Sequence, residues 1–551
     1  MEKFDSIVIG SGAGGLSAAL CLARSGQKVL VLEQHYVPGG WCHTFTLNGQ
    51  RFSPGVHYIG LLDEGQSTSE LYKGLGVAND LTFFRMNPKG YDHCMIANQK
   101  FDLPAGIENL QSKLISEFPK EEKNIKEYLS LIQKVNFELQ LMPKLEGFWQ
   151  KITVPFRTKN FGKFSLFSLK RVIGWHIKDP LLKAILNSQC GDHGVPPSQA
   201  CFPVHCSVMY HYFDGGFYPM GGGSSIVKAM TKKIKSYNGE VRVSQNVTKI
   251  IVENNQAKGV VLATGETILA NTIVSNADPS TTYLRLIGIE NISKKLNKKL
   301  SKTKYSVTSL ILFLTVELDV TKYGIDSGNI WKFESENIDE HFTTLTEGDI
   351  LEGDKFPALF ISCTTLKDPV SFNSKYHNFE VVTYVSYDSF KEFNHTEDYH
   401  SEAYELFKKK IIEKFLNNME ELIPDVRNHI VQAELGTPKT NEYYVNSTNG
   451  NVYGTNKTLN QVGPFSYKNK SEIENLYLCG ASTISHGVTG ATYSGLEAAA
   501  QILKCKSGDL LIKDESQKIK IYDAENSSTW SEFIHKKRED KIRNFKKINQ
   551  S

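Results

Sequence analysis

A glycine-rich turn between an apolar strand and a helix is the feature that most restricts the fold of this chain. The apolar run 7–9 predicts a strand that ends at Gly10-x-Gly12-x-x-Gly15, and residues 16–24 then have a helical pattern. Gly10 permits a tight turn, Gly12 lets a pyrophosphate approach the main chain, and Gly15 lets the helix pack close to the strand. The helix N-terminus can then hold phosphate groups. The pattern therefore predicts a dinucleotide-binding α/β unit of the Rossmann type.

The residues after this turn indicate which dinucleotide is bound. A second predicted strand, 28–32, delivers Glu33 at close to the ~20-residue spacing of the acid that binds a ribose with a free 2′-hydroxyl. The pair Gly39-Gly40 resembles the glycine pair that flavin oxidoreductases use beside the pyrophosphate and ribityl chain. We therefore expect FAD, bound in this block by Gly10, Gly12, Ala13, Gly14, Gly15, Glu33, Gln34, Gly39, Gly40, Trp41, Cys42 and His43.

Residues 217–280 form a second organised block. A helix is expected over 224–237, with Ser224 as its cap and Asn238-Gly239 as its stop. Strand-like pieces follow at 240–243, 247–252, 259–263 and 272–275. They predict a β-meander that returns the chain to the nucleotide-binding unit and brings Val247 to the cofactor. By pattern alone, a hairpin module without a ligand is an equal alternative.

A third block near residue 480 repeats the order of strand, glycine turn and helix. The strand 476–479 ends at Gly480, and a helix opens at Gly487 and runs to Leu503. The N-terminus of such a helix would stabilise the negative charge that gathers on a reduced flavin. This block adds Gly480, Gly487, Val488, Thr489, Gly490 and Ala491 to the expected FAD site.

Length and composition agree with a large enzyme of two or three domains. The 551 residues carry 63 basic and 60 acidic side chains, and a net charge of +3 gives no reason to expect a nucleic-acid partner. Nine cysteines without a CxxC pair favour reduced thiols over disulfides or zinc, so we expect no metal site. The first strand begins almost at residue 1, which leaves no room for a signal peptide, and the apolar runs are too short to cross a bilayer. We expect a cytoplasmic protein, peripheral on a membrane.

Several segments outside the glycine turns make a resemblance specific. Besides the glycine motifs, the resemblance rests on segments 33–35, 39–45, 55–60, 191–198 and 216–222. With these residues the chain resembles the retinol saturases, a branch of the phytoene desaturase and carotenoid isomerase superfamily. The resemblance covers residues 1–504. It implies FAD-dependent reduction of a carbon–carbon double bond in a retinoid or related isoprenoid polyene. Many superfamily members have arginine where this chain has Trp41, but saturase-like members also lack it.

Two other functions remain open at this point. A carotenoid isomerase or a desaturase would share every cofactor motif, and only the mass of the product would separate them from a saturase. Rab GDP-dissociation inhibitors have a related architecture and bind prenylated partners without flavin chemistry, which the intact glycines and Glu33 disfavour. No second strand-coupled GxGxxG is visible, so a dedicated nicotinamide domain is not expected and the electron donor is external and unidentified.

Reduction of a double bond needs a proton donor beside the flavin in a dry pocket. The candidates are His57, Tyr58, His193, His205 and Tyr210, chosen because they lie in or near the family-like segments. Each of them has a structural role as its alternative. Cys42 and Cys479 are expected near the cofactor as small packed residues rather than reactive thiols.

The sequence predicts two domains, and the residues outside the FAD-binding domain are expected to bind the substrate and contact a membrane. We expect an FAD-binding domain formed by segments 1–60, 217–280 and 471–504, and an α+β substrate domain formed by 61–216 and 281–470. In the substrate domain, helices such as 123–141 and 402–419 are expected to cover a sheet that includes the strands 307–316 and 380–384. Basic and aromatic residues alternate over 148–175, which suits either a membrane interface or a cap-domain core. The tail, 505–551, predicts a basic amphipathic helix that lies on an anionic membrane or packs on the body.

Overall fold

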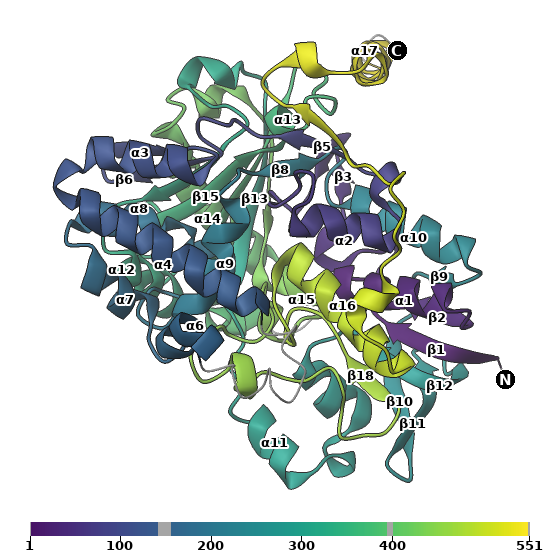
Figure 1. The fold of residues 1–551 in the computed structure, drawn as a ribbon. Coiled ribbons are helices and arrows are strands. Elements are labelled where there is room, and N and C mark those ends of the chain that lie inside the picture. The colour runs from purple at the N-terminus through teal and green to yellow at the C-terminus, as the bar shows by residue number, and fades with distance from the viewer. Residues whose placement is uncertain (1, 142–155, 394–400, 549–551) are drawn as a thin grey trace.

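The structure is a computed structural model that describes residues 2–141, 156–393 and 401–548. Two seven-stranded sheets form its framework, and smaller sheets of three and two strands accompany them. Figure 1 shows the first large sheet near the N-terminus with α1 and α16 against it, and the second beside it among the remaining helices. The α/β architecture expected from the glycine turns is confirmed, because a largely parallel sheet and its covering helices make up the nucleotide-binding side.

The first sheet has the strand order β10-β11-β12-β1-β2-β9, with β18 pairing to β12. β1 pairs in parallel with both β2 and β12, and β12 pairs in parallel with β18. Their apolar side chains are buried, as in sheets covered by helices on both faces. The strands are β1 (Lys3–Ile9), β2 (Val29–Leu32), β9 (Glu240–Arg242), β10 (Val247–Glu253), β11 (Gln256–Leu262), β12 (Thr267–Ser275) and β18 (Leu476–Leu478).

Three helices pack on this sheet: α1 (Ala13–Arg24), α10 (Ser224–Ser236) and α16 (Gly487–Leu503). α1 and α16 approach so closely that a Cβ on Gly495 would lie 1.9 Å from the carbonyl oxygen of Gly14. α1 begins three residues before the predicted start, because Gly12 is its N-cap and the following glycines belong to the first turn. The prediction that Ser224 caps α10 is wrong: the N-cap is Gly223, and the Ser224 hydroxyl donates to Gly221 instead.

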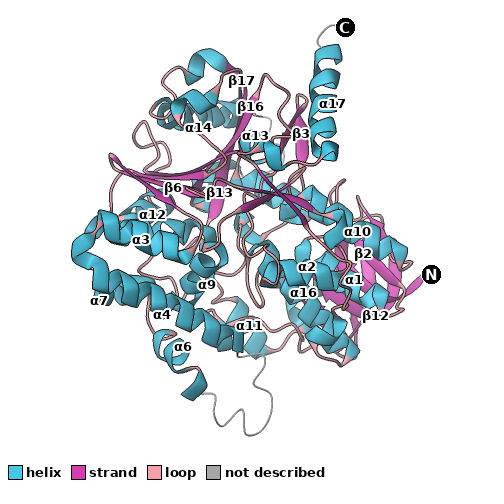
Figure 2. Ribbon diagram, turned by 45° about the horizontal axis from the view of Figure 1, so that its top comes forward, coloured by secondary structure: helices cyan, strands magenta, loops and turns pink. Residues whose placement is uncertain are grey.

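The second sheet has the order β17-β13-β16-β15-β14-β6-β7 and separates two apolar cores. One face packs against α4 and α9, and the other against α14. Figure 2 shows helices on both sides of its strands. Strand bounds are β6 (Asp92–Ile96), β7 (Gln99–Leu103), β13 (Thr308–Val316), β14 (Asn329–Phe333), β15 (Ala358–Cys363), β16 (His377–Val385) and β17 (Ile430–Gly436).

The helices around this second sheet come mainly from two stretches of the chain. The bounds are α3 (Ile107–Glu117), α4 (Glu122–Leu141), α6 (Lys159–Phe164), α7 (Leu169–His176), α8 (Pro180–Asn187), α9 (Phe202–Tyr212), α12 (Ile338–Glu347), α13 (Thr364–Lys367), α14 (Glu402–Glu420) and α15 (Pro438–Val445). Two further helices, α2 (Ser67–Leu75) and α11 (Lys294–Leu300), belong instead to the apolar cores on either side of the first sheet. The hairpin β3 (Phe45–Leu47)–β4 (Gln50–Phe52) packs on the second sheet through Phe52 and Phe313. Over the described ranges, every helix is too short or too polar to cross a bilayer.

The C-terminal tail contains more structure than the predicted helix. β19 (Lys520–Asp523) pairs in parallel with β5 (Thr82–Arg85), which in turn pairs with β8 (Phe217–Pro219). The helix follows as α17 (Glu532–Ile548), and the Phe545 ring near its end packs against Tyr376 with the ring centroids 5.5 Å apart. Trp530 and Ile534 pack against Phe84, so the beginning of this tail is anchored on the body of the protein.

Candidate functional site

A cavity lies at the carboxyl edge of the parallel strands. The strand register aligns Ile9 with Leu32 and Ser275, and Ser275 with Leu478, so these strands end at the same level. The residues that follow are Gly10, Glu33, Asn276 and Cys479, and all four line the cavity. Ligands of open α/β sheets bind at this edge.

The glycines of the first turn form a cradle that larger side chains would fill. A Cβ on Gly12 would lie 2.6 Å from the side-chain nitrogen of Asn276, and one on Gly15 would lie 2.1 Å from the carbonyl oxygen of Gly10. Gly14 is equally enclosed, by Asn276 and by main-chain atoms of Gly480 and Ala491. The bare backbone at the start of α1 therefore presents its N–H groups to the cavity, which fits the pyrophosphate of a dinucleotide.

Glu33 is held rigidly at the wall of the same cavity. Its Oε2 accepts hydrogen bonds from the backbone N–H and the hydroxyl of Ser11, at 2.9 and 2.6 Å, and its Oε1 accepts from the N–H of His35 at 2.9 Å. The Ser11 hydroxyl in turn accepts from the N–H of Gly39 at 2.8 Å. These bonds join Glu33, the acid predicted to bind the ribose, to the glycine pair, where Gly39 and Gly40 both have positive φ. The backbone N–H groups of the glycine turn and the Glu33 carboxylate fit the pyrophosphate and the ribose of FAD.

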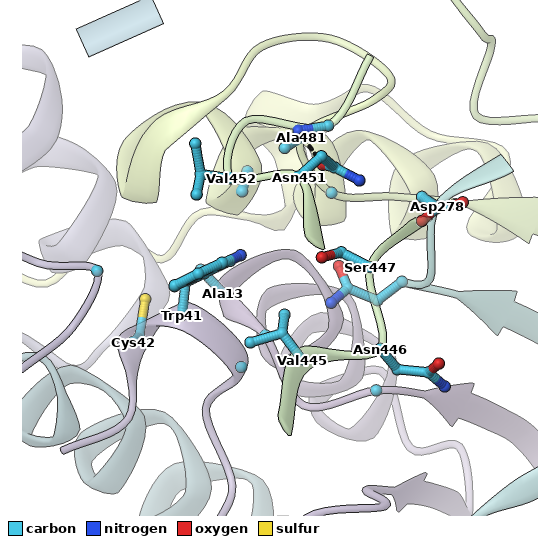
Figure 3. Close-up of a pocket in the computed structure, with 18 of the residues that line it drawn as sticks. Ala13, Trp41, Cys42, Asp278, Val445, Asn446, Ser447, Asn451, Val452 and Ala481 are labelled. Carbon is cyan, nitrogen blue, oxygen red and sulfur yellow. Dashed lines mark hydrogen bonds between the residues drawn. The ribbon is translucent and has the colours of Figure 1, made fainter. Parts of the chain in front are cut away.

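Residues far along the chain close the cavity from other sides. In Figure 3, Val445, Asn446 and Ser447 lie on one loop, with Asn451, Val452 and Ala481 above Trp41. The start of α16 also reaches this region, because Gly487, Val488 and Ala491 line the cavity. The positive end of the α16 dipole therefore faces the space beside the glycine pair.

The far part of the cavity is apolar and aromatic. It is lined by Trp331, Phe360, Val382, Tyr384 and Ile311, from four adjacent strands of the second sheet. The register pairs Trp331 with Phe360, Phe360 with Val382, and Val382 with Ile311, so these side chains share one face of the sheet. The ring centroids of Trp331 and Phe360 are 4.6 Å apart.

A hydrogen-bonded group of two acids and a tyrosine lies beside this aromatic wall, and one of the acids, Asp192, lines the cavity. The Tyr58 hydroxyl donates to Asp192 at 2.6 Å and lies 3.3 Å from Asp92. Asp92 also accepts from the side-chain amides of Asn329 at 2.8 Å and Gln189 at 2.9 Å. Burial raises the pKa of Asp92 to about 6, although the hydrogen bonds oppose this shift. Burial and the neighbouring Asp92 charge hold the pKa of Asp192 well above its usual range.

Lys367 is the buried cation of this group. Its Nζ donates to the carbonyl oxygen of His57 at 2.9 Å, to the Ser362 hydroxyl at 2.6 Å, and to the side-chain oxygen of Asn329. Burial lowers the pKa of Lys367 to about 7. His57 itself lines the cavity, and its Nδ1 lies 3.1 Å from a carboxylate oxygen of Glu380.

Most residues predicted to bind FAD line this one cavity: Gly10, Gly12, Ala13, Gly14, Glu33, Gln34, Gly39, Gly40, Trp41, Cys42, Val247, Gly480, Gly487, Val488 and Ala491. Gly15, His43, Thr489 and Gly490 lie just outside it. The Gly15 position serves helix packing, and the His43 ring bonds to the carbonyl of Gly40. Cys42 and Cys479 also line the cavity, and burial raises the pKa of Cys42 to about 12, so this thiol stays protonated.

Of the five candidate proton donors, only His57 lines the cavity. Tyr58 lies one layer behind, bonded to Asp192. Tyr210 packs against Phe213, away from the cavity.

His193 and His205 are buried on the side of the 188–193 turn that faces α9. His193 Nε2 and His205 Nδ1 are 3.3 Å apart, and the other nitrogen of His205 bonds to the carbonyl of Leu186 at 3.0 Å. The Cys190 Sγ lies 4.0 Å from the same His205 nitrogen, so the three side chains bring together ligand atoms that could hold a metal ion. Burial lowers the pKa of His205 to about 4, which keeps it neutral.

The residues that sequence reasoning missed are mostly those of the second sheet. Asp192 lies in a segment that the resemblance singled out, but its neighbour His193 was chosen instead. Asp92, Lys367 and Trp331 carried no local signal, because each stands in an ordinary strand or short helix. Only a strand-pairing prediction that aligned Asp92 with Asn329 could have found the network.

The family of this chain follows from comparison with known proteins. The model of the family described as flavin containing amine oxidoreductase matches residues 13–503. The chain belongs to this family. It is an FAD-dependent oxidoreductase, and the glycine cradle and Glu33 are the residues that fit the cofactor.

Curated relatives in this family match almost the whole chain. All-trans-retinol 13,14-reductase of Danio rerio is 28% identical over 526 residues, which cover 91% of this chain and 86% of the relative. Prolycopene isomerase 1 of an Oncidium hybrid cultivar is 26% identical over 516 residues, covering 91% of this chain and 84% of the relative. The resemblance to the saturase and isomerase superfamily is confirmed.

Solved structures share the fold at low sequence identity. A putrescine oxidase with putrescine bound has a TM-score of 0.60 at 12% identity, over 91% of this chain and 99% of its own. A Rab GDI from Plasmodium falciparum has a TM-score of 0.51 at 12% identity, over 92% and 99% of the two chains. These likenesses describe the fold alone.

Proposed function

We propose that this protein reduces one carbon–carbon double bond of a retinoid or related isoprenoid polyene, with FAD as the redox cofactor. The observation that carries the proposal is the continuity of the cavity, which passes from the glycine cradle to the aromatic face of the second sheet. The similarity to retinol 13,14-reductases over 91% of the chain supports the same substrate class. A long apolar ligand gains about 0.8 kcal/mol for each buried methylene-sized group, so an aromatic channel suits a polyene.

The chain's own residues have three tasks in this reaction. Trp331 and Phe360 provide a wall on which a conjugated chain can stack, and Tyr384 fixes the nearby turn by donating its hydroxyl to the carbonyl of Gly191. The apolar surroundings exclude water from the reacting bond. When bound, reduced FAD supplies the hydride.

The test is a product analysis on the flavin-loaded protein. The protein is reduced with dithionite without oxygen and incubated with all-trans-retinol, and the product is analysed by mass. We expect a gain of two hydrogens, with reoxidation of the flavin absorbance. A purified protein that binds FAD but leaves every polyene at its original mass would contradict the proposal.

A second candidate is cis–trans isomerisation of a carotenoid, favoured by the prolycopene isomerase relatives, which match the same 91% of the chain. The same incubation with a poly-cis carotenoid separates the two functions. An isomerised product of unchanged mass, with the flavin still reduced, would assign the protein to the isomerase function.

Loading of such a substrate from a membrane is part of the proposal. The side chains of Phe156, Leu166 and Trp175 are 82, 73 and 51% exposed. The same stretch of the chain carries the basic residues Arg157, Lys159, Lys163, Lys170 and Arg171. Exposed aromatic and basic side chains together suit the interface of an anionic bilayer. Part of the predicted 148–175 stretch lies outside the described residues, and Phe164 is buried in the core rather than exposed.

Sedimentation with vesicles tests the membrane contact. We expect Phe156→Ser combined with Trp175→Ser to lower binding to phosphatidylserine vesicles about tenfold. A deletion of 536–551 measures the contribution of the rest of α17, with Trp530 and Ile534 left against Phe84. Equal binding by all variants would contradict the membrane contact.

The electrons that reduce the flavin come from an external donor. A screen of cellular reductants for their ability to reduce the flavin would identify it.

A further inference from the structure

In the described part of the chain, Asp192 is one of three acidic residues that line the cavity, and unlike Glu33 and Asp278 it lies in the turn beside the aromatic wall. Asp192 lines the cavity, whereas Tyr58, His193, His205 and Tyr210 do not. It lies in the turn 188–193, whose position beside the second sheet is tightly fixed. A Cβ on Gly191 would lie 2.2 Å from the Trp331 ring, and the backbone oxygen of Asp192 accepts a hydrogen bond from His486 at 3.0 Å.

His486 is the N-cap of α16, the helix that opens beside the glycine pair. The turn that carries Asp192 is therefore bonded to the cofactor side of the cavity by His486 and packed against the aromatic side by Gly191. Asp192 therefore lies between the part of the cavity lined by the start of α16 and the part lined by the aromatic side chains.

The two carboxyl groups joined by Tyr58 have unequal surroundings. Asp92 accepts from Asn329 and Gln189 and lies 3.3 Å from the Tyr58 hydroxyl, and Asn329 is itself bonded to the Lys367 cation. Among the described residues, Asp192 has a side-chain hydrogen bond only from Tyr58, to its Oδ2. Because both carboxyl groups lie within reach of the same Tyr58 hydroxyl, ionising both would cost electrostatic free energy. The one with fewer hydrogen bonds therefore retains its proton. Asp92 is the ionised member, and Asp192 is the neutral acid.

We propose that Asp192 is the proton donor of the reaction, and that Tyr58 and Asp92 position it and keep it protonated. The inference rests on the proposed function. Asp192 transfers its proton to one carbon of the double bond, and the neighbouring carbon receives the hydride. Two C–H bonds replace the π bond, the O–H bond of Asp192 breaks, and the carboxylate that remains is held by the Tyr58 hydroxyl until it regains a proton from water.

The experiment compares Asp192→Asn with the matched variant Asp368→Asn in the flavin-loaded protein. Asp368 is also a buried carboxyl with a raised pKa, but it accepts from the N–H of Gly221 outside the cavity. Reoxidation of the reduced flavin by all-trans-retinol is followed by stopped flow. Asp192→Asn should slow it at least ~100-fold, whereas Asp368→Asn should leave it unchanged. FAD affinity should be the same in all three proteins.

An infrared spectrum gives a readout that needs no substrate. A protonated Asp192 contributes a carboxylic-acid C=O band that shifts in D2O, and this band should be present at neutral pH and lost in Asp192→Asn. If wild-type protein has the band but reduces no polyene, the proposed function fails while the neutral acid stands. Absence of the band, or a rate in Asp192→Asn within threefold of wild type, overturns the inference. A large loss of rate in His57→Gln alone would move the donor to His57.

Discussion

The two large sheets build their parts of the cavity in different ways. The first sheet uses the ends of parallel strands, where Gly10, Glu33 and Cys479 follow directly after a strand. The second uses the face of its strands, where Trp331 and Phe360 come from different strands and meet through register. The expected cofactor contacts are thus made by backbone and turns, and the proposed substrate contacts by side chains on a rigid surface. A change in one sheet should therefore affect one ligand and spare the other.

The largest effect is expected from Gly12→Val. The side chain would enter the cradle, where a Cβ alone already lies 2.6 Å from Asn276. We expect the flavin-to-protein absorbance ratio of the purified protein to fall about tenfold or more, because a dinucleotide can no longer approach the turn. Gly162→Ala is the control, since nothing lies within 4 Å of its Cβ. Normal flavin content in the valine variant would contradict the assignment of the glycine cradle to the cofactor.

The complementary change is Trp331→Leu in the second sheet. It removes part of the aromatic wall without touching the glycine cradle. Flavin content should stay normal, and kcat/KM for the polyene should fall about 10- to 100-fold because the reacting bond is less well placed. Flavin spectra and product mass on the same preparation measure both quantities. Loss of flavin together with activity would show that the two sheets are not separable.

A third prediction concerns the rim of the second sheet. Burial disfavours the charged form of His93, but its hydrogen bonds to Asp102 at 2.6 Å and Asp326 at 2.9 Å outweigh burial and raise its pKa to about 9. A raised pKa stabilises the fold fully below the unfolded value of about 6.5, and this contribution is lost as the pH rises through 9.

His93→Gln should therefore lower the free energy of unfolding by about 2–3 kcal/mol at pH 6. The same variant should differ much less from wild type near pH 10. Denaturant unfolding at the two pH values measures the difference. An equal loss at both values would mean that packing, not the charge of His93, stabilises this rim.

The smallest effect is expected at the start of α10, on the cofactor side. Ser224 is not the N-cap, so Ser224→Ala should change the free energy of unfolding by less than about 0.5 kcal/mol. Ser293 does cap α11, accepting from the N–H of Leu296 at 3.1 Å, and Ser293→Ala should cost about 1 kcal/mol. Thermal unfolding of the two variants compares them, and the reverse order would contradict the cap assignment.

The candidate proton donors show which part of the site the sequence left open. The resemblance singles out segment 191–198, but a short 3-10 helix turns its neighbouring side chains to different sides. Asp192 lines the cavity, and His193 lies against His205. Burial then separates the two residue types, since it lowers the pKa of His205 and raises that of Asp192.

The sequence by itself determined the cofactor side of the protein. Gly10, Gly12 and Gly15 mark a turn whose steric demands are local, and the strand, helix and Glu33 around them lie within one short stretch. Helix α16 was predicted with both of its ends for the same reason. Only the tertiary structure decided the other half of the cavity. Tyr58, Asp92 and Asp192 are far apart in the chain, and strand pairing and burial in a low-dielectric interior make them one group of proton-carrying residues.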